Sequence, residues 1–329
     1  MKIFDFKNKI NNEEFSQCIT SINNGKIVVL PTDTVYGIAV DATNQIAVEN
    51  LYKVKKRSKK NPINVLVSSK DMAKKCVKDF NKTADILIEK FWPGPLTIVF
   101  EKNEYIKDIV TAGKETIGIR MPENEVTLKI IDKVNKPLAV PSANISGRPS
   151  GTSIEDIVSD FCDNVDIYID YGESKIGIES TIVKINDDSV SILRQGKITK
   201  NEIEALGIKV IELEKENNFK HYKIDTNCKI VYNVDNLLKI KELNDSIRNN
   251  IDKKIAVITF EEDIQHIDEK FNIDIYNLKS KDNLEFAMKN IYKILREIDS
   301  KKYDICLISL VDKTDKTEGI INIFKEMCK

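Results

Sequence analysis

Residues 179–194 read ESTIVKINDDSVSILR, and this stretch decides the fold class of the first half of the chain. Apolar residues dominate 180–185 and 190–193, which predicts two short strands. Only the polar residues 186–189 separate them, which leaves no room for a crossover helix between the two strands. Strict alternation of strands and helices therefore fails here, and a sheet that is partly antiparallel is favoured.

The rest of the first half shows the same mixture of elements. Apolar patterning predicts further strands at 27–30, 64–67, 96–100, 116–120, 138–140 and 166–169, and helices at 12–24, 44–57, 82–92, 124–135 and 153–162. We therefore expect a twisted, mixed α/β sheet with helices packed on it rather than a doubly wound parallel sheet.

The second half has a different organisation. The pattern lapses near Leu206, and residues 212–227 are polar and aperiodic, which is typical of a linker. Beyond it, strands predicted at 229–232, 255–259, 273–276 and 305–310 alternate with helices predicted at 237–251, 284–298 and 318–328. The sequence thus predicts domains at 1–211 and 228–329, joined by a linker at 212–227, the second being a smaller Rossmann-like parallel α/β domain.

Composition limits the kind of protein. The chain has 329 residues, 41% of them hydrophobic, which is enough for two cores. Lys and Arg number 51 against 52 Asp and Glu, so any contact with RNA must be a local patch. Six scattered cysteines and the lack of a long apolar run predict a cytoplasmic protein with no membrane association. With only His221 and His266, a zinc site or a histidine triad is hard to assemble.

Two short clusters suggest where an anion binds. Lys55-Lys56-Arg57 and Ser142-Ala143-Asn144 each stand where a predicted element ends, so folding can bring them together. The guanidinium and ammonium groups can neutralise phosphate oxygens, while the hydroxyl and amide complete the hydrogen bonding. This combination predicts a site for a phosphorylated anion.

Seven segments of the first half occur together in a recognisable order. They are Pro31-Thr32-Asp33-Thr34-Val35-Tyr36-Gly37; Lys55-x-Arg57 with Asn61-Pro62; Phe91-Trp92-Pro93-Gly94-Pro95-Leu96-Thr97; Gly118-Ile119-Arg120-Met121-Pro122; Pro141-Ser142-Ala143-Asn144-Ile145-Ser146-Gly147; Glu179-Ser180-Thr181; and Leu193-Arg194. In order and spacing they resemble the Sua5/YrdC family. Lys220-His221-Tyr222 stands where the longer Sua5 branch has a linker with a His-Tyr pair. Leu66 stands where archaeal members often carry a histidine.

The resemblance implies a YrdC-like catalytic domain and the activity of an L-threonylcarbamoyladenylate synthase, a nucleotidyltransferase. L-threonine, bicarbonate and ATP would give threonylcarbamoyl-AMP and pyrophosphate, for N6-threonylcarbamoyladenosine at position 37 of tRNA. Threonine's amine can attack bicarbonate or CO2, and the carbamate oxygen can attack the α-phosphorus. No protein nucleophile is needed, so positioning and charge neutralisation should carry the rate.

The resemblance also implies residue roles. Lys55 and Arg57 would be the catalytic cations, acting on bicarbonate and triphosphate oxygens. ATP would be bound by Arg57, Asn61, Thr116, Ser142, Asn144, Ser150, Arg194 and Tyr222. L-threonine would be bound by Thr34, Arg120, Val140 and Ser180, with Arg120 pairing its carboxylate through two hydrogen bonds. No metal ligand is expected from the protein, since Mg2+ would be held by the ATP phosphates.

The partners implied are ATP, L-threonine, bicarbonate, a downstream tRNA threonylcarbamoyltransferase and a weak tRNA contact. Two alternatives stay open from the sequence. One is an RNA-binding module that uses the basic run 53–60 through phosphate contacts alone. The other is a carbamoyl-adenylate domain of the hydrogenase-maturation kind, although the C-x-x-C zinc motifs and the acylphosphatase-like region of those chains are missing.

Overall fold

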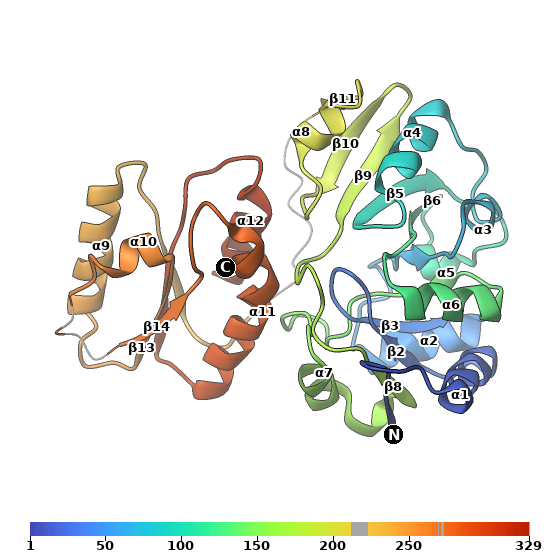
Figure 1. Ribbon diagram of the computed structural model, residues 1–329, viewed down its shortest axis with the longest axis horizontal. Helices are drawn as coiled ribbons and strands as arrows, with labels where there is room; N and C mark the ends of the chain where they lie inside the picture. Colours follow the sequence, from blue (N-terminus) through green and yellow to red (C-terminus); the bar gives the residue numbers. More distant parts are fainter. Residues whose placement is uncertain (212–222, 269, 271–272, 329) are drawn as a thin grey trace. The chain divides into compact units, whose positions relative to one another are not determined.

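The computed structural model of the chain describes residues 1–211, 223–268, 270 and 273–328. These residues divide into two compact units (Figure 1). The first unit takes 1–146 and the described residues from 150 onward up to 211; the second takes 147–149 and the described residues from 223 to 328. None of the helices in the described part of the chain is both long enough and apolar enough to cross a membrane.

One mixed sheet runs through the first unit. Its strands, as far as the chain is described, are β1 (Lys2–Asp5), β2 (Val28–Leu30), β3 (Gly37–Asp41), β4 (Val65–Leu66), β5 (Leu96–Glu101), β6 (Thr116–Arg120), β7 (Leu138–Ala139), β8 (Ile167–Asp170), β9 (Thr181–Asn186), β10 (Ser189–Arg194) and β11 (Lys209–Ile211). They are ordered β1-β8-β2-β3-β7-β4-β6-β5-β9-β10-β11. β9 and β10 pair antiparallel, whereas β5 and β9 pair parallel. The predicted mixed sheet is therefore confirmed.

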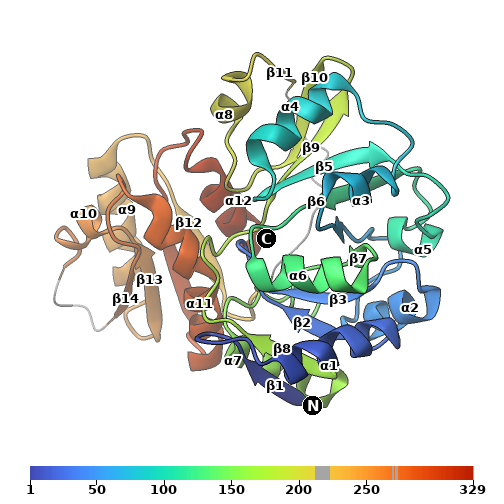
Figure 2. The same cartoon turned by 45° about the vertical axis from the view of Figure 1, so that its right-hand side comes forward.

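Helices cover this sheet. They are α1 (Asn12–Asn23), α2 (Gln45–Val54), α3 (Lys70–Lys74), α4 (Lys82–Phe91), α5 (Asp108–Thr111), α6 (Glu125–Val134), α7 (Ile154–Phe161) and α8 (Lys200–Glu204). α6 shows why such segments are helical: Asn124 caps it by accepting from the Thr127 amide, and Val126, Ile130 and Ile131 form a buried stripe. α1 and α6 lie side by side (Figure 2).

β1, β3 and β11 were not expected from the sequence. β3 is buried along its whole length and pairs antiparallel with β2, with Val28 opposite Ala39. A strand buried on both faces has no polar and apolar alternation, so its pattern does not distinguish it from the motif that precedes it. As a result, the segment 31–36 is not the end of a strand followed by coil but a connection held between two paired strands.

The second unit alternates strands and helices as predicted. Its elements are β12 (Cys228–Val231), α9 (Asn236–Arg248), β13 (Ile255–Thr259), α10 (Glu261–Ile264), β14 (Asp274–Asn277), α11 (Leu284–Lys301), β15 (Ile305–Ser309) and α12 (Glu318–Met327). All pairs in the sheet, ordered β12-β15-β13-β14, are parallel. Val231, Leu243, Ile247, Val257 and Leu307 form much of its core.

Candidate active site

The connection between β2 and β3 carries Thr34, the first candidate residue. Thr32, Asp33 and Thr34 are all at least 94% buried, although all three are polar. The Thr32 hydroxyl donates to the Val35 carbonyl at 2.5 Å and lies 3.0 Å from the Thr34 hydroxyl. The amides of Ile176 and of the following glycine donate to the carbonyls of Asp33 and Thr34. The backbone of this segment is thus fixed from both sides, and its side chains have defined positions.

Arg120, at the end of β6, joins this segment to the Trp-Pro-Gly-Pro turn. Its Nε donates to the Gly94 carbonyl at 2.9 Å, its Nη1 donates to the Thr34 hydroxyl at 2.7 Å, and its Nη2 forms a short ion pair with Asp33 Oδ1. Burial lowers the pKa of Arg120, and the charge of Asp33 opposes this shift. These contacts use three of the five N–H groups of the guanidinium, so two donors remain for a ligand.

Lys55 lies at the C-terminal cap of α2 and is 1% exposed. Its ammonium donates to the carbonyls of Ser142 at 2.5 Å and Asn144 at 2.6 Å, and it lies 3.4 Å from the Asn144 side-chain oxygen. Burial lowers the pKa of Lys55 well below its ordinary value; the charge of Arg57 adds to this effect, and that of Asp160 opposes it. The structure therefore brings the two predicted clusters together, with Lys55 holding the 142–144 segment.

Arg57 and Asn61 form a neighbouring pair. Lys56 adopts a left-handed backbone conformation (φ 50°), and in this turn Lys55 is buried while the Arg57 side chain is partly exposed. Arg57 donates from Nε to the Asn61 carbonyl at 3.2 Å and from Nη2 to the Pro62 carbonyl at 2.8 Å. Arg57 is close enough to Lys55 to lower its pKa, so two cationic side chains lie near each other at the end of α2.

Ser180, which is predicted to bind threonine, contacts Arg194, which is predicted to bind ATP. Arg194, at the end of β10, donates from Nη2 to the Ser180 carbonyl at 2.9 Å and to its hydroxyl at 3.2 Å. The same hydroxyl lies 2.8 Å from the Thr97 hydroxyl on β5. Arg194 is also near enough to Arg120 for its charge to lower the pKa of Arg120. The structure thus connects Thr34, Arg120, Arg194 and Ser180 in one neighbourhood.

Gly196 fixes the backbone on which this pair depends. A methyl group added there would lie 2.3 Å from the Glu179 carbonyl oxygen and 2.5 Å from the Ser180 carbonyl carbon. These are backbone atoms and cannot rotate away. We expect Gly196→Ala to lower the free energy of unfolding by about 2–3 kcal/mol and to reduce activity by displacing Ser180 and Arg194. Urea denaturation and steady-state kinetics measure the two effects.

The control is Gly118→Ala on β6. There the nearest atom to an added methyl group is the Asn64 side-chain oxygen at 2.4 Å, and a side chain can move. The expected loss of unfolding free energy is below about 1.5 kcal/mol. An equal or larger loss for Gly118→Ala would contradict the role given to the Gly196 backbone.

The remaining predicted site residues are Ser150, Val140, Thr116 and Tyr222, and the first three have fewer described contacts with the groups named above. Ser150 is fully buried, and its hydroxyl donates to the carboxylate of Glu179 at 2.6 Å. Glu179 directly precedes Ser180 in the chain. Val140 is 8% exposed and lies against Gly37. Thr116 stands at the opposite end of β6 from Arg120, and no described hydrogen bond of its side chain joins it to another predicted residue. Tyr222 lies outside the described residues.

Three side chains contact the predicted site residues but were given no role from the sequence. Asp33 holds Arg120, Thr97 contacts Ser180, and Glu179 accepts from Ser150. All three belong to the seven segments that resemble the family, so the sequence shows that these residues are present. It does not show which residues they contact, because their partners are 29 to 87 positions away in the chain.

The described residues form no metal-binding site of their own. Across residues 1–211, 223–268, 270 and 273–328, no group of three or more His, Cys, Asp or Glu side chains is arranged to hold a metal ion. The donors of the site are mostly cations, hydroxyls and amides, which suit anionic ligands rather than a bare cation.

Two family models match the chain. Residues 20–196 match the model that covers Sua5, YciO and YrdC and is described as "Telomere recombination". Residues 198–323 match the model described as "Threonylcarbamoyl-AMP synthase, C-terminal domain". The first match spans more than half of the chain, and the two together span nearly all of it.

Individual relatives agree with these matches. Threonylcarbamoyl-AMP synthase of Pyrococcus abyssi (strain GE5 / Orsay) is 30% identical over 321 residues, which cover 92% of this chain and 90% of that protein. The enzyme of the same name from Bacillus subtilis (strain 168) is 36% identical over 197 residues, which cover 60% of this chain and 57% of that protein. The solved structure of P. abyssi Sua5 complexed with L-threonine has a TM-score of 0.89 at 28% identity, covering 100% of this chain and 98% of that one.

Proposed function

The chain belongs to the Sua5/YrdC family, and from this we propose that it synthesises L-threonylcarbamoyl-AMP from L-threonine, bicarbonate and ATP with release of pyrophosphate. The observation that carries the proposal is the contact of Arg194 with Ser180 beside Arg120 and Thr34. Cations and hydroxyls gathered in this way suit an amino acid and a nucleotide held next to each other.

Arg120 is the central residue on the amino-acid side. Its two remaining N–H groups can pair with the carboxylate of threonine, while Asp33, Thr34 and Gly94 hold the guanidinium in place. Ser180 supplies a hydroxyl on the same side, and Val140 a small apolar wall. That the P. abyssi relative was solved with L-threonine supports this assignment.

Arg57, Arg194 and Lys55 supply positive charge on the nucleotide side. Arg57 and Arg194 are partly exposed, so their guanidinium groups can reach phosphate oxygens. Lys55 holds the 142–144 segment, and with it the hydroxyl and amide of Ser142 and Asn144. We propose that Asn61, Thr116 and Ser150 complete the nucleotide contacts and that Tyr222, from the linker at 212–227, covers ATP.

These residues bind and orient rather than form covalent bonds. The amine of threonine adds to CO2 with loss of a proton, or to bicarbonate with loss of water, and gives a carbamate. The carbamate oxygen attacks the α-phosphorus and pyrophosphate leaves, while fixed positive charges stabilise the charge that develops on the phosphate oxygens. The described residues offer no carboxylate cage, so Mg2+ is proposed to arrive on the ATP phosphates and to be held by them and by water.

Omission assays test this function. Pyrophosphate release is expected with ATP, L-threonine, bicarbonate and Mg2+ together, and to fall to background when any one of them is left out. Mass spectrometry should identify threonylcarbamoyl-AMP in the complete mixture. Release of pyrophosphate in the absence of threonine would contradict the proposal, because the reaction would then not need the amino acid whose carboxylate Arg120 is proposed to bind.

The product is expected to pass to a downstream tRNA threonylcarbamoyltransferase, and a weak tRNA contact can use exposed lysines of the run 53–60. Lys55 takes no part in such a surface because it is buried. An RNA-binding module alone would lose affinity steeply with added salt and would ignore threonine. Filter binding at several salt concentrations, with and without threonine, separates the two functions.

A further inference from the structure

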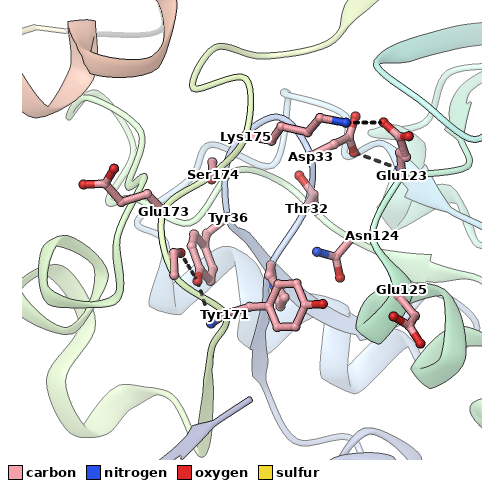
Figure 3. A pocket seen from close by; sticks show the side chains of 12 residues that line it. Thr32, Asp33, Tyr36, Glu123, Asn124, Glu125, Tyr171, Glu173, Ser174 and Lys175 are labelled. Carbon is pink, nitrogen blue, oxygen red and sulfur yellow. Dashed lines mark hydrogen bonds and ion pairs between the residues drawn. The ribbon is translucent and has the colours of Figure 1, made fainter. Parts of the chain in front are cut away.

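The segment 171–177 follows β8 and ends shortly before Ser180, which is predicted to bind threonine. It contains neither helix nor strand, and its first residues line the cavity that Figure 3 shows. Gly172 and Gly177, near its two ends, have left-handed backbone conformations with φ of 80° and 86°. Glycine adopts such values at no steric cost. The path of this segment therefore depends on the hydrogen bonds that its backbone makes.

The end of the segment fixes two residues on the threonine side of the candidate site. The Ile176 amide donates to the Asp33 carbonyl at 2.8 Å, and the Gly177 amide donates to the Thr34 carbonyl at 2.9 Å. The carboxylate of Asp33 and the hydroxyl of Thr34 both contact Arg120. A displacement of the segment would therefore also displace the groups that hold the Arg120 guanidinium.

The start of the segment is held by the hydroxyl of Tyr36. This hydroxyl donates to the Gly172 carbonyl at 2.6 Å and accepts from the Tyr171 amide at 3.0 Å (Figure 3). Tyr36 is fully buried, and burial raises the pKa of its hydroxyl, so the proton that is donated stays in place. One phenol oxygen thus satisfies two backbone groups of the segment.

The backbone of Tyr36 is itself fixed by two hydrogen bonds. Its amide donates to the Gly151 carbonyl at 3.3 Å, and its carbonyl accepts from the Ala143 amide at 2.7 Å. These bonds do not involve the side chain, so they remain when the hydroxyl is removed. The hydroxyl is therefore a fixed point to which the segment 171–177 is bound.

The middle of the segment has weaker contacts. The Ser174 amide donates to the Thr152 carbonyl at 3.1 Å. Lys175 lies 3.3 Å from Glu123, but both side chains are more than half exposed, and an exposed ion pair contributes little to stability. We therefore expect the start of the segment to move when the Tyr36 hydroxyl is lost.

We propose that Tyr36 is a positioning residue for the bound amino acid, because its hydroxyl holds the segment 171–177 in place. Through that segment it sets the positions of Asp33 and Thr34, and with them that of Arg120. The inference rests on the proposed function, in which Thr34 and Arg120 bind threonine. Tyr36 acts through the backbone of these residues and not by contact with the substrate.

Replacement of Tyr36 by phenylalanine tests the role of the hydroxyl, because the ring and the backbone bonds are kept. We expect Tyr36→Phe to raise the KM for L-threonine about fivefold or more, which is the effect of one lost hydrogen bond. The KM for ATP should stay within about twofold, because the residues on the nucleotide side keep their contacts. Steady-state kinetics with each substrate varied in turn measure this difference, which a general loss of stability would not produce.

Tyr168, on β8, provides the matched control. It is also fully buried, and its hydroxyl donates to the Cys162 carbonyl at 2.6 Å, the same distance as from Tyr36 to Gly172. Tyr168→Phe should therefore lower the Tm by about as much as Tyr36→Phe, but it should leave the KM for threonine unchanged. An equal rise of this KM in both variants, or no rise in Tyr36→Phe, would overturn the proposal.

Amide hydrogen exchange gives a readout that does not depend on activity. In Tyr36→Phe, the amides of Tyr171, Ile176 and Gly177 are expected to exchange about fivefold faster or more, whereas Tyr168→Phe should not change them. Unchanged exchange in Tyr36→Phe would overturn the proposal. A wild-type chain that fails to bind threonine in calorimetry would contradict the proposed function, while the exchange rates would still decide whether the hydroxyl positions the segment.

Discussion

Replacement of Arg120 by methionine is expected to lower kcat/KM for L-threonine by about 1,000-fold. Three contacts hold its guanidinium rigid, and its two remaining N–H groups have no partner among the described residues. The same change removes the partner of Asp33, which is fully buried, and should reduce the free energy of unfolding by about 3–5 kcal/mol. Steady-state kinetics with varied threonine and urea denaturation provide the two readouts.

The double variant Arg120→Met with Asp33→Asn separates the two effects. Without the carboxylate, the buried unpaired charge is gone, so most of the lost stability should return. Activity should not return, because the threonine carboxylate still lacks its guanidinium. If the double variant regained both, Arg120 would be a partner of Asp33 only, and the threonine assignment would be wrong.

Replacement of Lys55 by methionine is the second change with a large expected effect. The ammonium holds the carbonyls of Ser142 and Asn144, and both would be left without this donor in a buried place. At about 1–3 kcal/mol for each lost hydrogen bond, the unfolding free energy should fall by about 2–6 kcal/mol. A drop in kcat of about 100-fold is expected as well, since the 142–144 segment and a nearby positive charge are both lost.

Lys53→Met is the matched control, because Lys53 is exposed and stands on the last turn of the same helix. It should change stability by less than about 0.5 kcal/mol and leave turnover unaffected. Thermal denaturation and pyrophosphate release at saturating substrates compare the two variants. A Lys55→Met enzyme that loses stability but turns over normally would make Lys55 a structural clamp without a part in the reaction.

Much of the fold could be predicted because most elements carry a local signal. β6 has the predicted bounds, and the helices begin at capping residues such as Asn81 and Asn124 and bury one apolar stripe. β3 could not be predicted in this way. Its five buried residues show no alternation, and only pairing with β2 and β7 makes them a strand.

For the site, the sequence determined which residue types are present and in what order, since the motifs around Thr34, Lys55, Arg120, Ser142 and Ser180 are continuous in the chain. That was enough to predict the family and the phosphate and carboxylate chemistry. The sequence could not indicate that the ammonium of Lys55 is directed at carbonyls 87 and 89 positions away.

Only the tertiary structure decided the partners: Asp33 with Arg120, Arg194 with Ser180, and Lys55 with the 142–144 segment. Asp33 and Arg120 are 87 positions apart and Lys55 and Asn144 are 89 apart, whereas Arg194 and Ser180 are 14 apart and meet through the pairing of β9 with β10. Their distance in space is set by how the mixed sheet orders its strands, with β6 beside β5 and β5 beside β9. Local propensity contains no information about that order, because it results from the burial of all the strands together.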